Sequence, residues 1–434
     1  MADPNFNEMM SITKKVDPRR TQVVSKQTKF AEFPVEEYRS RYAKAIALME
    51  HEGLDALLVT QEENVRYFTG YLSILWCSLF RPYVALLPRD PSVGPSLIVP
   101  AQETGNALHT SWVNDVHLYP DQENPVPHIL AEIKKKGLET GMIGTELGFG
   151  MRLGMNVNQF EELRSSLASG RIVDGTPIIQ GVRMIKSAAE IECLRRACEI
   201  SQTATQAGWE ALRPGMTEKE LAAIMASTMY REGAEMGTKA SFFAMMAGPD
   251  RYKTVNALAS DKVIEEGDFV IVDGGAVYKG YATDFIRQAV LGSPTQEQQR
   301  FFDIAREAND AAIQVIGPGV SGADVYEAGM KVFERHDVLE YNVLNIIGHG
   351  VGMDLHEVPW LGERDKVYSA STILEPGMVV CIEPVFAGAN DPEWQKGIWI
   401  QEDKVVVTAT GHEVITNQLS KELWVQQPKV HATA

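Results

Sequence analysis

The chain has 434 residues, of which 44% are hydrophobic and 23% charged, and its formal net charge is −17. These proportions are those of a globular protein and exclude a disordered chain, a coiled coil and a collagen-like fibre. The acidic charge lacks the positive footprint of a nucleic-acid-binding protein, and the longest apolar runs, such as residues 83–88, are far shorter than the roughly 20 residues of a membrane helix.

The first thirty residues, 1–30, are polar and lack periodicity, which predicts an irregular N-terminal arm. They contain no apolar stretch after a basic start, so a secretory signal is not expected. The four cysteines form no C-x-x-C pair; they are Cys77, Cys193, Cys198 and Cys381. A disulfide framework and a cysteine zinc site are therefore not expected, and we infer a protein of the reducing cytoplasm.

Alternating helical and strand-like patterns over residues 31–186 predict an α/β domain. Helical spacing begins after Pro34 and ends at Gly53, a residue type that favours the helix C-terminus. The apolar run Leu54–Thr60 follows as a strand. Further strands are expected at residues 83–87, 97–99 and 142–145.

A change in the pattern of helical and strand-like segments marks a second domain, residues 187–434. Ser187 and Glu190 have the S-x-x-E spacing of a capping box, ahead of a long helix through Ile191, Leu194 and Cys198. Beyond this helix, long helical stretches alternate with short apolar strands that end in an acidic residue.

The second domain also contains an internal repeat. Pro-Gly turns at residues 214–215 and 318–319 each precede a helix that begins with a capping box. Each half then has a strand that places a carboxylate six residues after a glycine, Gly267 to Asp273 and Gly377 to Glu383. Two such units in a pseudo-twofold relation would bring the two carboxylates together.

Five acidic or histidine side chains occur at strand ends or in glycine-rich turns: Asp273, Asp284, His349, Glu383 and Glu402. Each alone has an ordinary explanation, such as a turn cap for Asp273, a loop histidine for His349 or a solvated strand end for Glu402. Buried carboxylates are costly unless they are paired or bind a cation. Oxygen-rich ligation with one imidazole suits Mn²⁺, Fe²⁺, Co²⁺ or Zn²⁺. Four carboxylates and one histidine suit two ions that share bridging carboxylates.

These motifs resemble the creatinase/prolidase/methionine-aminopeptidase superfamily, which has the pita-bread fold. The resemblance is carried by Asp273-x10-Asp284, GHGVGxxxHE at 348–357, EPGMVVxIEP at 375–384 and the ED pair at 402–403. The N-terminal domain is similar to that of creatinase and prolidase, particularly NVRYFTGY at 64–71 and CSLFRPY at 77–83. The resemblance implies a creatinase/prolidase-like α/β domain, followed by a pita-bread catalytic domain of α+β type with pseudo-twofold symmetry.

The resemblance also implies roles for the five residues. Asp273 would bind one metal ion, His349 and Glu383 would hold the second, and Asp284 and Glu402 would bridge both. A water molecule between the ions would be the nucleophile, because the cations stabilise hydroxide. Glu383 would also act as the proton shuttle.

Two further residues match substrate contacts of the superfamily. His356 would contact the scissile carbonyl and stabilise the developing oxyanion. Arg81 matches a creatinase arginine that binds the substrate carboxylate, for which a planar guanidinium is well suited; a surface arginine or a local salt bridge is the alternative. In creatinase-like dimers the matching loop reaches the partner's catalytic domain, which implies a homodimer with shared active sites.

Two positions depart from the pattern. The histidine with which peptidases of this fold contact substrate falls on Asn256. The asparagine amide donates a hydrogen bond but cannot take up a proton at pH 7. The arginine often found two residues before the last glutamate falls on Ile400. Creatinase itself lacks the metal ligands that this chain retains. We therefore expect a metal-dependent hydrolase that cleaves a C–N bond (amide, peptide or amidine) in a small carboxylate-bearing substrate, with weak activity on ordinary peptides.

Candidate substrates are dipeptides with C-terminal proline and cyclic amidines, as in the related ectoine hydrolases. The alternative is a metal-assisted lyase that acts on an onium carboxylate such as dimethylsulfoniopropionate. Those lyases carry an acidic residue near the position of Leu355, which argues against this alternative. A non-enzymatic binding protein with the same fold is a third possibility, and the five intact ligands argue against it.

Overall fold

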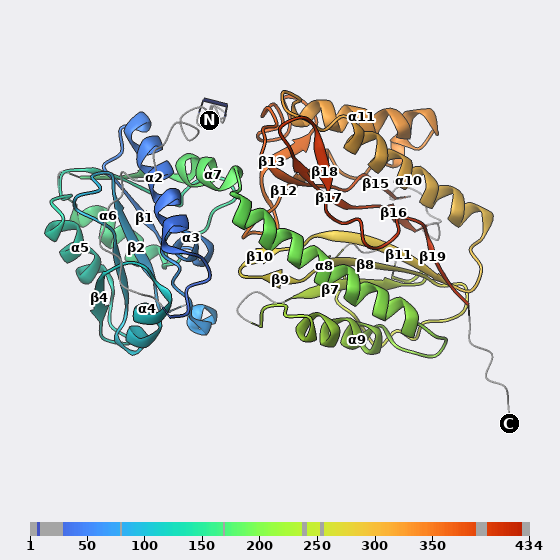
Figure 1. Cartoon of the computed structure of the whole chain (residues 1–434), viewed down its shortest axis with the longest axis horizontal. Helices are drawn as coiled ribbons and strands as arrows, with labels where there is room; N and C mark the ends of the chain where they lie inside the picture. The colour runs from blue at the N-terminus through green and yellow to red at the C-terminus, as the bar shows by residue number, and fades with distance from the viewer. Residues whose placement is uncertain are drawn as a thin grey trace. The chain divides into compact units, whose positions relative to one another are not determined.

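The computed structural model describes residues 7–8, 29–78, 80–167, 170–236, 241–251, 256–387 and 397–427. Most of the arm expected at residues 1–30 lies outside these ranges. The chain divides into two compact units, Ala2–Arg183 and Met184–Ala434 (Figure 1). Among the described residues, no helix is long and apolar enough to cross a membrane.

The N-terminal unit is built on a six-stranded sheet of order β4-β3-β2-β1-β5-β6. Its strands are β1 (Ala56–Val59), β2 (Val84–Pro88), β3 (Ser96–Pro100), β4 (Asp115–Tyr119), β5 (Met142–Thr145) and β6 (Arg171–Asp174). The sheet is mixed, since β1 pairs antiparallel with β2 and parallel with β5. The four strands predicted from the sequence are all present, whereas the edge strands β4 and β6 were not predicted.

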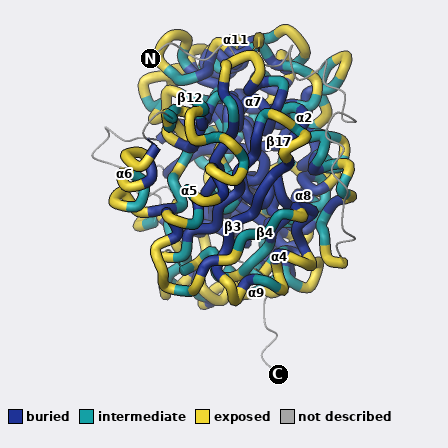
Figure 2. Tube along the Cα trace, turned by 90° about the vertical axis from the view of Figure 1, so that its left-hand side faces the viewer, coloured by how far each residue is buried: buried dark blue, intermediate teal, exposed yellow. Residues whose placement is uncertain are grey.

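The helices of this unit are α2 (Val35–Glu52), α3 (Glu62–Thr69), α4 (Thr104–Thr110), α5 (Val126–Lys135), α6 (Val157–Ser166) and α7 (Thr176–Met184). Helix α2 ends as predicted at Gly53, which has a left-handed φ of 72°. Ile129 and Ile133 of α5 pack in one core with Ile143 of β5. Strand β3 is buried along its length, whereas α6 buries only Leu163 (Figure 2).

The C-terminal unit contains two sheets, of order β19-β11-β8-β7 and β13-β12-β14-β17-β18. The first is formed by β7 (Phe242–Ala247), β8 (Phe269–Gly275), β11 (Phe285–Leu291) and β19 (Trp424–Gln426). The second is formed by β12 (Ile346–Gly350), β13 (Glu357–Gly362), β14 (Val379–Ile382), β17 (Asp403–Val407) and β18 (His412–Val414). Two short hairpins complete the unit, β9 (Val277–Tyr278) with β10 (Tyr281–Ala282), and β15 (Val385–Ala387) with β16 (Ile398–Ile400).

Four helices cover these sheets in pairs. Helices α8 (Ala188–Ala211) and α9 (Glu218–Arg231) pack against each other and against β7 and β8. Helices α10 (Gln296–Gln314) and α11 (Gly322–Arg335) likewise pack together and against β12 to β14 (Figure 1). The capping box that was predicted at Ser187 begins α8, with both reciprocal hydrogen bonds present.

The internal repeat is visible in the two halves of this unit. Helices α9 and α11 begin with capping boxes at Thr217 and Ser321. In each half the capping residue also forms an isolated antiparallel bridge, Thr217 with Val263 and Ser321 with Ile373. The strand that follows is β8 in one half and β14 in the other, and it pairs antiparallel with β11 or β17. Of the two carboxylates that the repeat predicted to meet, Asp273 lies in β8, and Glu383 directly follows the equivalent strand β14.

Candidate metal centre

The register of the second sheet places several polar side chains on one face. Strands β12 and β14 pair so that His349 lies opposite Cys381, and β14 and β17 pair so that Cys381 lies opposite Lys404. Successive side chains of a strand point to opposite faces. Glu383, two residues after Cys381, and Glu402, two residues before Lys404, therefore share this face. One face of the sheet therefore carries His349, Cys381, Glu383, Glu402 and Lys404.

The first sheet contributes the remaining carboxylates. Asp273 lies in β8, and Asp284 directly precedes β11, its antiparallel partner. The ligand atoms of Asp273, Asp284 and Glu402 lie within 4.8 Å of one another. The Nε2 atom of His349 lies 3.7 Å from Oδ2 of Asp284 and 3.3 Å from Oε1 of Glu383. The structure therefore brings all five predicted ligands into one cluster.

This cluster is buried and short of hydrogen-bond donors. His349 and Glu402 are 0% and 1% exposed. Nδ1 of His349 donates to the Gly350 carbonyl oxygen at 2.9 Å, which leaves the lone pair of Nε2 directed at the carboxylates. Among the described residues, Nε2 of His349 and Oε1 of Glu402 have no hydrogen-bond partner. An imidazole nitrogen and a carboxylate oxygen without hydrogen-bond partners in one buried cluster are the donor set that a divalent ion takes.

The carboxylates also disfavour one another's ionisation. Burial raises the pKa of Asp273 well above its usual range, and the charges of Asp284 and Glu383 raise it further. Burial likewise raises the pKa of Glu402, with the charges of Asp284 and Glu383 as the next causes. Carboxylates packed this closely ionise together only when cations compensate their charge. The residues present therefore fit a divalent metal centre.

His356 lies beside this cluster. Its ring centroid is 4.3 Å from that of His349, and the ring stacks on Trp360 at 5.8 Å and 9°. The ligand atoms of His356, His349 and Asp284 lie within 4.8 Å of one another. Although solvent reaches the ring, burial by the protein atoms packed around it lowers the pKa of His356 to about 4. The imidazole is therefore neutral at pH 7 and has an N–H to donate.

The two positions that depart from the superfamily pattern have different surroundings. Asn256 is exposed and has a left-handed φ of 59°, and the residues before it, 252–255, lie outside the described part of the chain. Ile400 is 4% exposed and pairs with Val385 across the β15–β16 hairpin. An apolar contact therefore occupies the position where related proteins often carry a charged group.

Arg81 is engaged within its own unit. Its Nε and Nη2 atoms donate to the two carboxylate oxygens of Asp121 at 2.6 and 3.0 Å, and Nη1 donates to the Ser78 hydroxyl at 2.6 Å. This is the local salt bridge that was the alternative to a substrate contact. A substrate-binding role for Arg81 remains a prediction.

The sequence pattern did not point to Arg287, which anchors one of the ligands. Arg287 is buried in β11, and its Nη1 atom donates to the Glu402 backbone carbonyl at 2.7 Å. Its Nη2 atom donates to Oδ1 of Asp403 at 2.8 Å and to the Thr416 carbonyl at 3.0 Å. The strand segment that carries Glu402 is thereby tied to the other sheet. Its position three residues after Asp284 was the one feature of the sequence that could have indicated this role.

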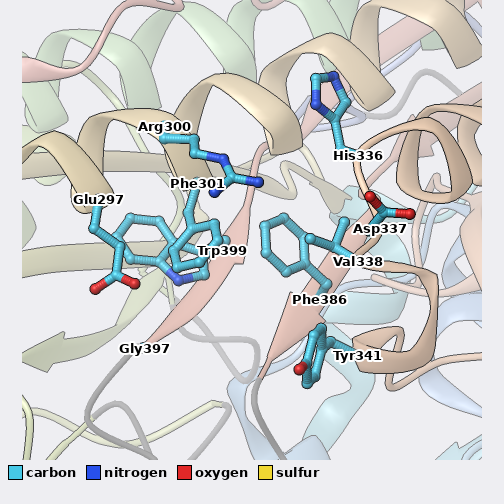
Figure 3. A pocket seen from close by; sticks show the side chains of 10 residues that line it. All are labelled: Glu297, Arg300, Phe301, His336, Asp337, Val338, Tyr341, Phe386, Gly397 and Trp399. Carbon is cyan, nitrogen blue, oxygen red and sulfur yellow. The ribbon is translucent and has the colours of Figure 1, made fainter.

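A separate cavity of about 240 Å³ lies between the β15–β16 hairpin and α10 (Figure 3). Its aromatic lining is Phe301, Tyr341, Phe386 and Trp399. Phe386 and Trp399 pair with each other and alternate with the Val385–Ile400 pair, so they occupy the opposite face of the hairpin. None of the five predicted ligands lines this cavity, which is therefore distinct from the metal centre.

Comparisons with known proteins identify the family. The model of metallopeptidase family M24 matches residues 192–409, and the model of the creatinase/prolidase N-terminal domain matches residues 41–185. The chain belongs to metallopeptidase family M24. This M24 chain is therefore a metallohydrolase enzyme, and the fold predicted from its motifs, a creatinase-like domain followed by a pita-bread domain, is confirmed.

Relatives of the M24 chain extend over nearly its whole length. It is 30% identical over 373 residues to the Xaa-Pro dipeptidase of Pyrococcus horikoshii, which covers 86% of this chain and 95% of that protein. It is 29% identical over 386 residues to the Xaa-Pro dipeptidase of Pyrococcus furiosus, which covers 87% of this chain and 98% of that protein. Among solved structures, the prolidase from Thermococcus sibiricus superposes with a TM-score of 0.76 at 26% identity, over 89% of this chain and 99% of the other.

Proposed function

We propose that this M24 chain uses two divalent metal ions to hydrolyse the peptide bond of a small carboxylate-bearing substrate. A dipeptide with C-terminal proline is the first candidate substrate. The observation that carries the proposal is the convergence of Asp273, Asp284, His349, Glu383 and Glu402 on one buried cluster with orphaned ligand atoms. The dipeptidase names of the relatives support a peptide-bond hydrolase and do not support the lyase alternative.

In this proposal, Asp273 would hold one ion, His349 and Glu383 would hold the other, and Asp284 and Glu402 would serve both. When bound, the ions, which would be Mn²⁺, Fe²⁺, Co²⁺ or Zn²⁺, would supply Lewis-acid activation of a water molecule as the nucleophile. Glu383 accepts a proton from the attacking water and returns it to the leaving amine nitrogen. The neutral imidazole of His356 donates a hydrogen bond to the oxygen on which negative charge develops.

The departures at Asn256 and Ile400 bear on efficiency and substrate choice. Neither side chain supplies a charge to a substrate, since one is an amide and the other is aliphatic. We therefore propose that Xaa-Pro dipeptides are cleaved slowly, and that cyclic amidines are the second substrate class to test. A homodimer with shared active sites and a cytoplasmic location remain predictions.

The test is release of free proline from Gly-Pro and Ala-Pro, with product analysis of amidine and onium carboxylate substrates in parallel. Chelator-treated protein should be inactive, and added Mn²⁺ or Co²⁺ should restore turnover. Asp284→Ala should lose both metal and activity, because a bridging carboxylate serves both ions. Active protein that contains well under one ion per chain would contradict the proposal, as would products of elimination without water addition.

A further inference from the structure

Lys404 is a fully buried lysine next to the metal centre. It is 0% exposed, and its strand position places it opposite Cys381, on the same face of the sheet as His349. Its Nζ atom donates one hydrogen bond, to the Ala282 carbonyl oxygen at 2.8 Å. Ala282 lies two residues before Asp284, so this bond links β17 to the segment that carries a predicted bridging ligand.

Lys404 lies beside both predicted bridging carboxylates. Glu402 is two residues before it, on the same face of the sheet, and the Ala282 carbonyl that accepts from Nζ is two residues before Asp284. A lysine ammonium has three N–H donors, and for Lys404 one acceptor is present among the described residues. Its position is therefore explained by the cluster's negative charge rather than by a dedicated ion-pair partner.

Other cations near this strand are committed elsewhere. Arg287 and Lys421 both pair with Asp403, at 2.8 and 2.9 Å. Asp403 lies between Glu402 and Lys404 in the strand, so its side chain points to the opposite face. Lys404 is thus separated from this second charge group by the strand itself.

We propose that Lys404 is the resident counter-charge of the carboxylate cluster and that it lowers the cluster's affinity for divalent ions. Four carboxylates carry four negative charges, and two divalent ions balance them fully. Without ions, the ammonium relieves part of the carboxylate repulsion and stabilises the empty cluster. With ions bound, the same ammonium repels them. Lys404 would therefore favour a site that exchanges its metal, and this inference rests on the metal centre in the proposed function.

The Lys404 charge should stabilise the metal-free protein and weaken metal binding, and these two opposite effects can be measured separately. Lys404→Met keeps most of the buried side-chain volume and removes the charge. The apo variant should melt at a lower temperature than apo wild type. Addition of Mn²⁺ should raise its melting temperature by more than it raises that of wild type, and its Mn²⁺ dissociation constant should be about tenfold lower, as judged by competition with a chromophoric chelator.

Two variants separate charge from packing. Lys421→Met removes the lysine that pairs with Asp403 on the opposite face of the strand, and it should lower the melting temperature equally with and without Mn²⁺. Lys404→Arg retains the charge and should return the Mn²⁺ affinity toward that of wild type. If Lys404→Met binds Mn²⁺ equally or more weakly, with the same loss of melting temperature in both states, Lys404 is only a packing residue.

Variants that fail to fold without ions are still informative. Lys404→Gln, which keeps a hydrogen-bond donor, provides a second neutral side chain. The inference requires Mn²⁺ to rescue the folding of Lys404→Met or Lys404→Gln, because the ions replace the lost charge; failure with Mn²⁺ present overturns it. Wild-type protein that binds none of Mn²⁺, Fe²⁺, Co²⁺ and Zn²⁺ would overturn the metal centre itself, and that result is distinct from an unchanged Mn²⁺ affinity in the variants.

Discussion

Glu383 is one of the two cluster carboxylates that solvent partly reaches, and its Oε1 atom lies 3.3 Å from Nε2 of His349. Glu383→Gln removes the negative charge and the proton acceptor while roughly keeping the shape. We expect kcat to fall by at least about 10²-fold, in line with general acid–base catalysis. The measurement is steady-state turnover at saturating Mn²⁺, with metal content determined on the same sample. Near-wild-type turnover would reject the proton-shuttle role.

Asn256 is the second residue whose exchange is informative. It is exposed and takes the place of a histidine that related peptidases use. We expect kcat/KM for Gly-Pro below about 10⁴ M⁻¹s⁻¹ in wild type. Asn256→His should raise this kcat/KM, because an imidazole, unlike an amide, can take up a proton near pH 7. Efficient wild-type cleavage of Gly-Pro would show instead that asparagine serves the peptidase reaction.

At the scale of elements, the glycines that flank His349 allow strands to approach closely. A Cβ atom added at Gly348 would lie 2.0 Å from the Cys381 carbonyl oxygen, and one added at Gly350 would lie 2.3 Å from that of Val358. Gly348→Ala should therefore destabilise the protein by about 1–3 kcal/mol, as overpacking does, and displace a strand that carries a ligand. Calorimetry with and without Mn²⁺ measures both effects.

The matched control for Gly348→Ala is Gly411→Ala. A Cβ atom added at Gly411 meets nothing within 4 Å. We expect this variant to keep its melting temperature and its metal content. Equal losses in the two variants would show that close approach at Gly348 does not explain the glycine.

At the scale of the whole molecule, Arg81 tests whether active sites are shared between subunits. If it binds the substrate carboxylate, Arg81→Ala should lower kcat/KM by roughly 10–150-fold through KM, with little change in metal content. Mixing Arg81→Ala subunits with Glu383→Gln subunits should then restore activity, because some sites combine two intact partners. Product formation after subunit exchange is the measurement.

Asp121→Ala distinguishes this role from the salt bridge that the structure shows. It frees the Arg81 guanidinium from its carboxylate partner. If Arg81 only stabilises its own unit, Asp121→Ala and Arg81→Ala should lower the melting temperature alike and leave KM unchanged. No recovery in mixed samples whose subunits demonstrably exchange would likewise place Arg81 outside the partner's site.

The sequence by itself determined the features that depend on local pattern. The capping boxes at Ser187, Thr217 and Ser321 occur where spacing predicted them. The strand with Asp273 is also present, although β8 continues to Gly275, and His349 lies in strand β12 rather than in a glycine-rich turn. These features are readable because a cap, a strand period or a close approach constrains residues only a few positions apart. The repeated strand with a terminal carboxylate also predicted that the two halves meet.

Only the tertiary structure decided which distant groups lie together. Arg81 has its partner 40 residues away in Asp121, and Arg287 reaches Asp403 across 116 residues. The sequence around Lys404 does not distinguish it from other lysines in strands. The strand register places it opposite Cys381, on the face that carries predicted metal ligands. Burial and the sum of neighbouring charges depend on every strand packed around a group, so no local pattern of residues contains them.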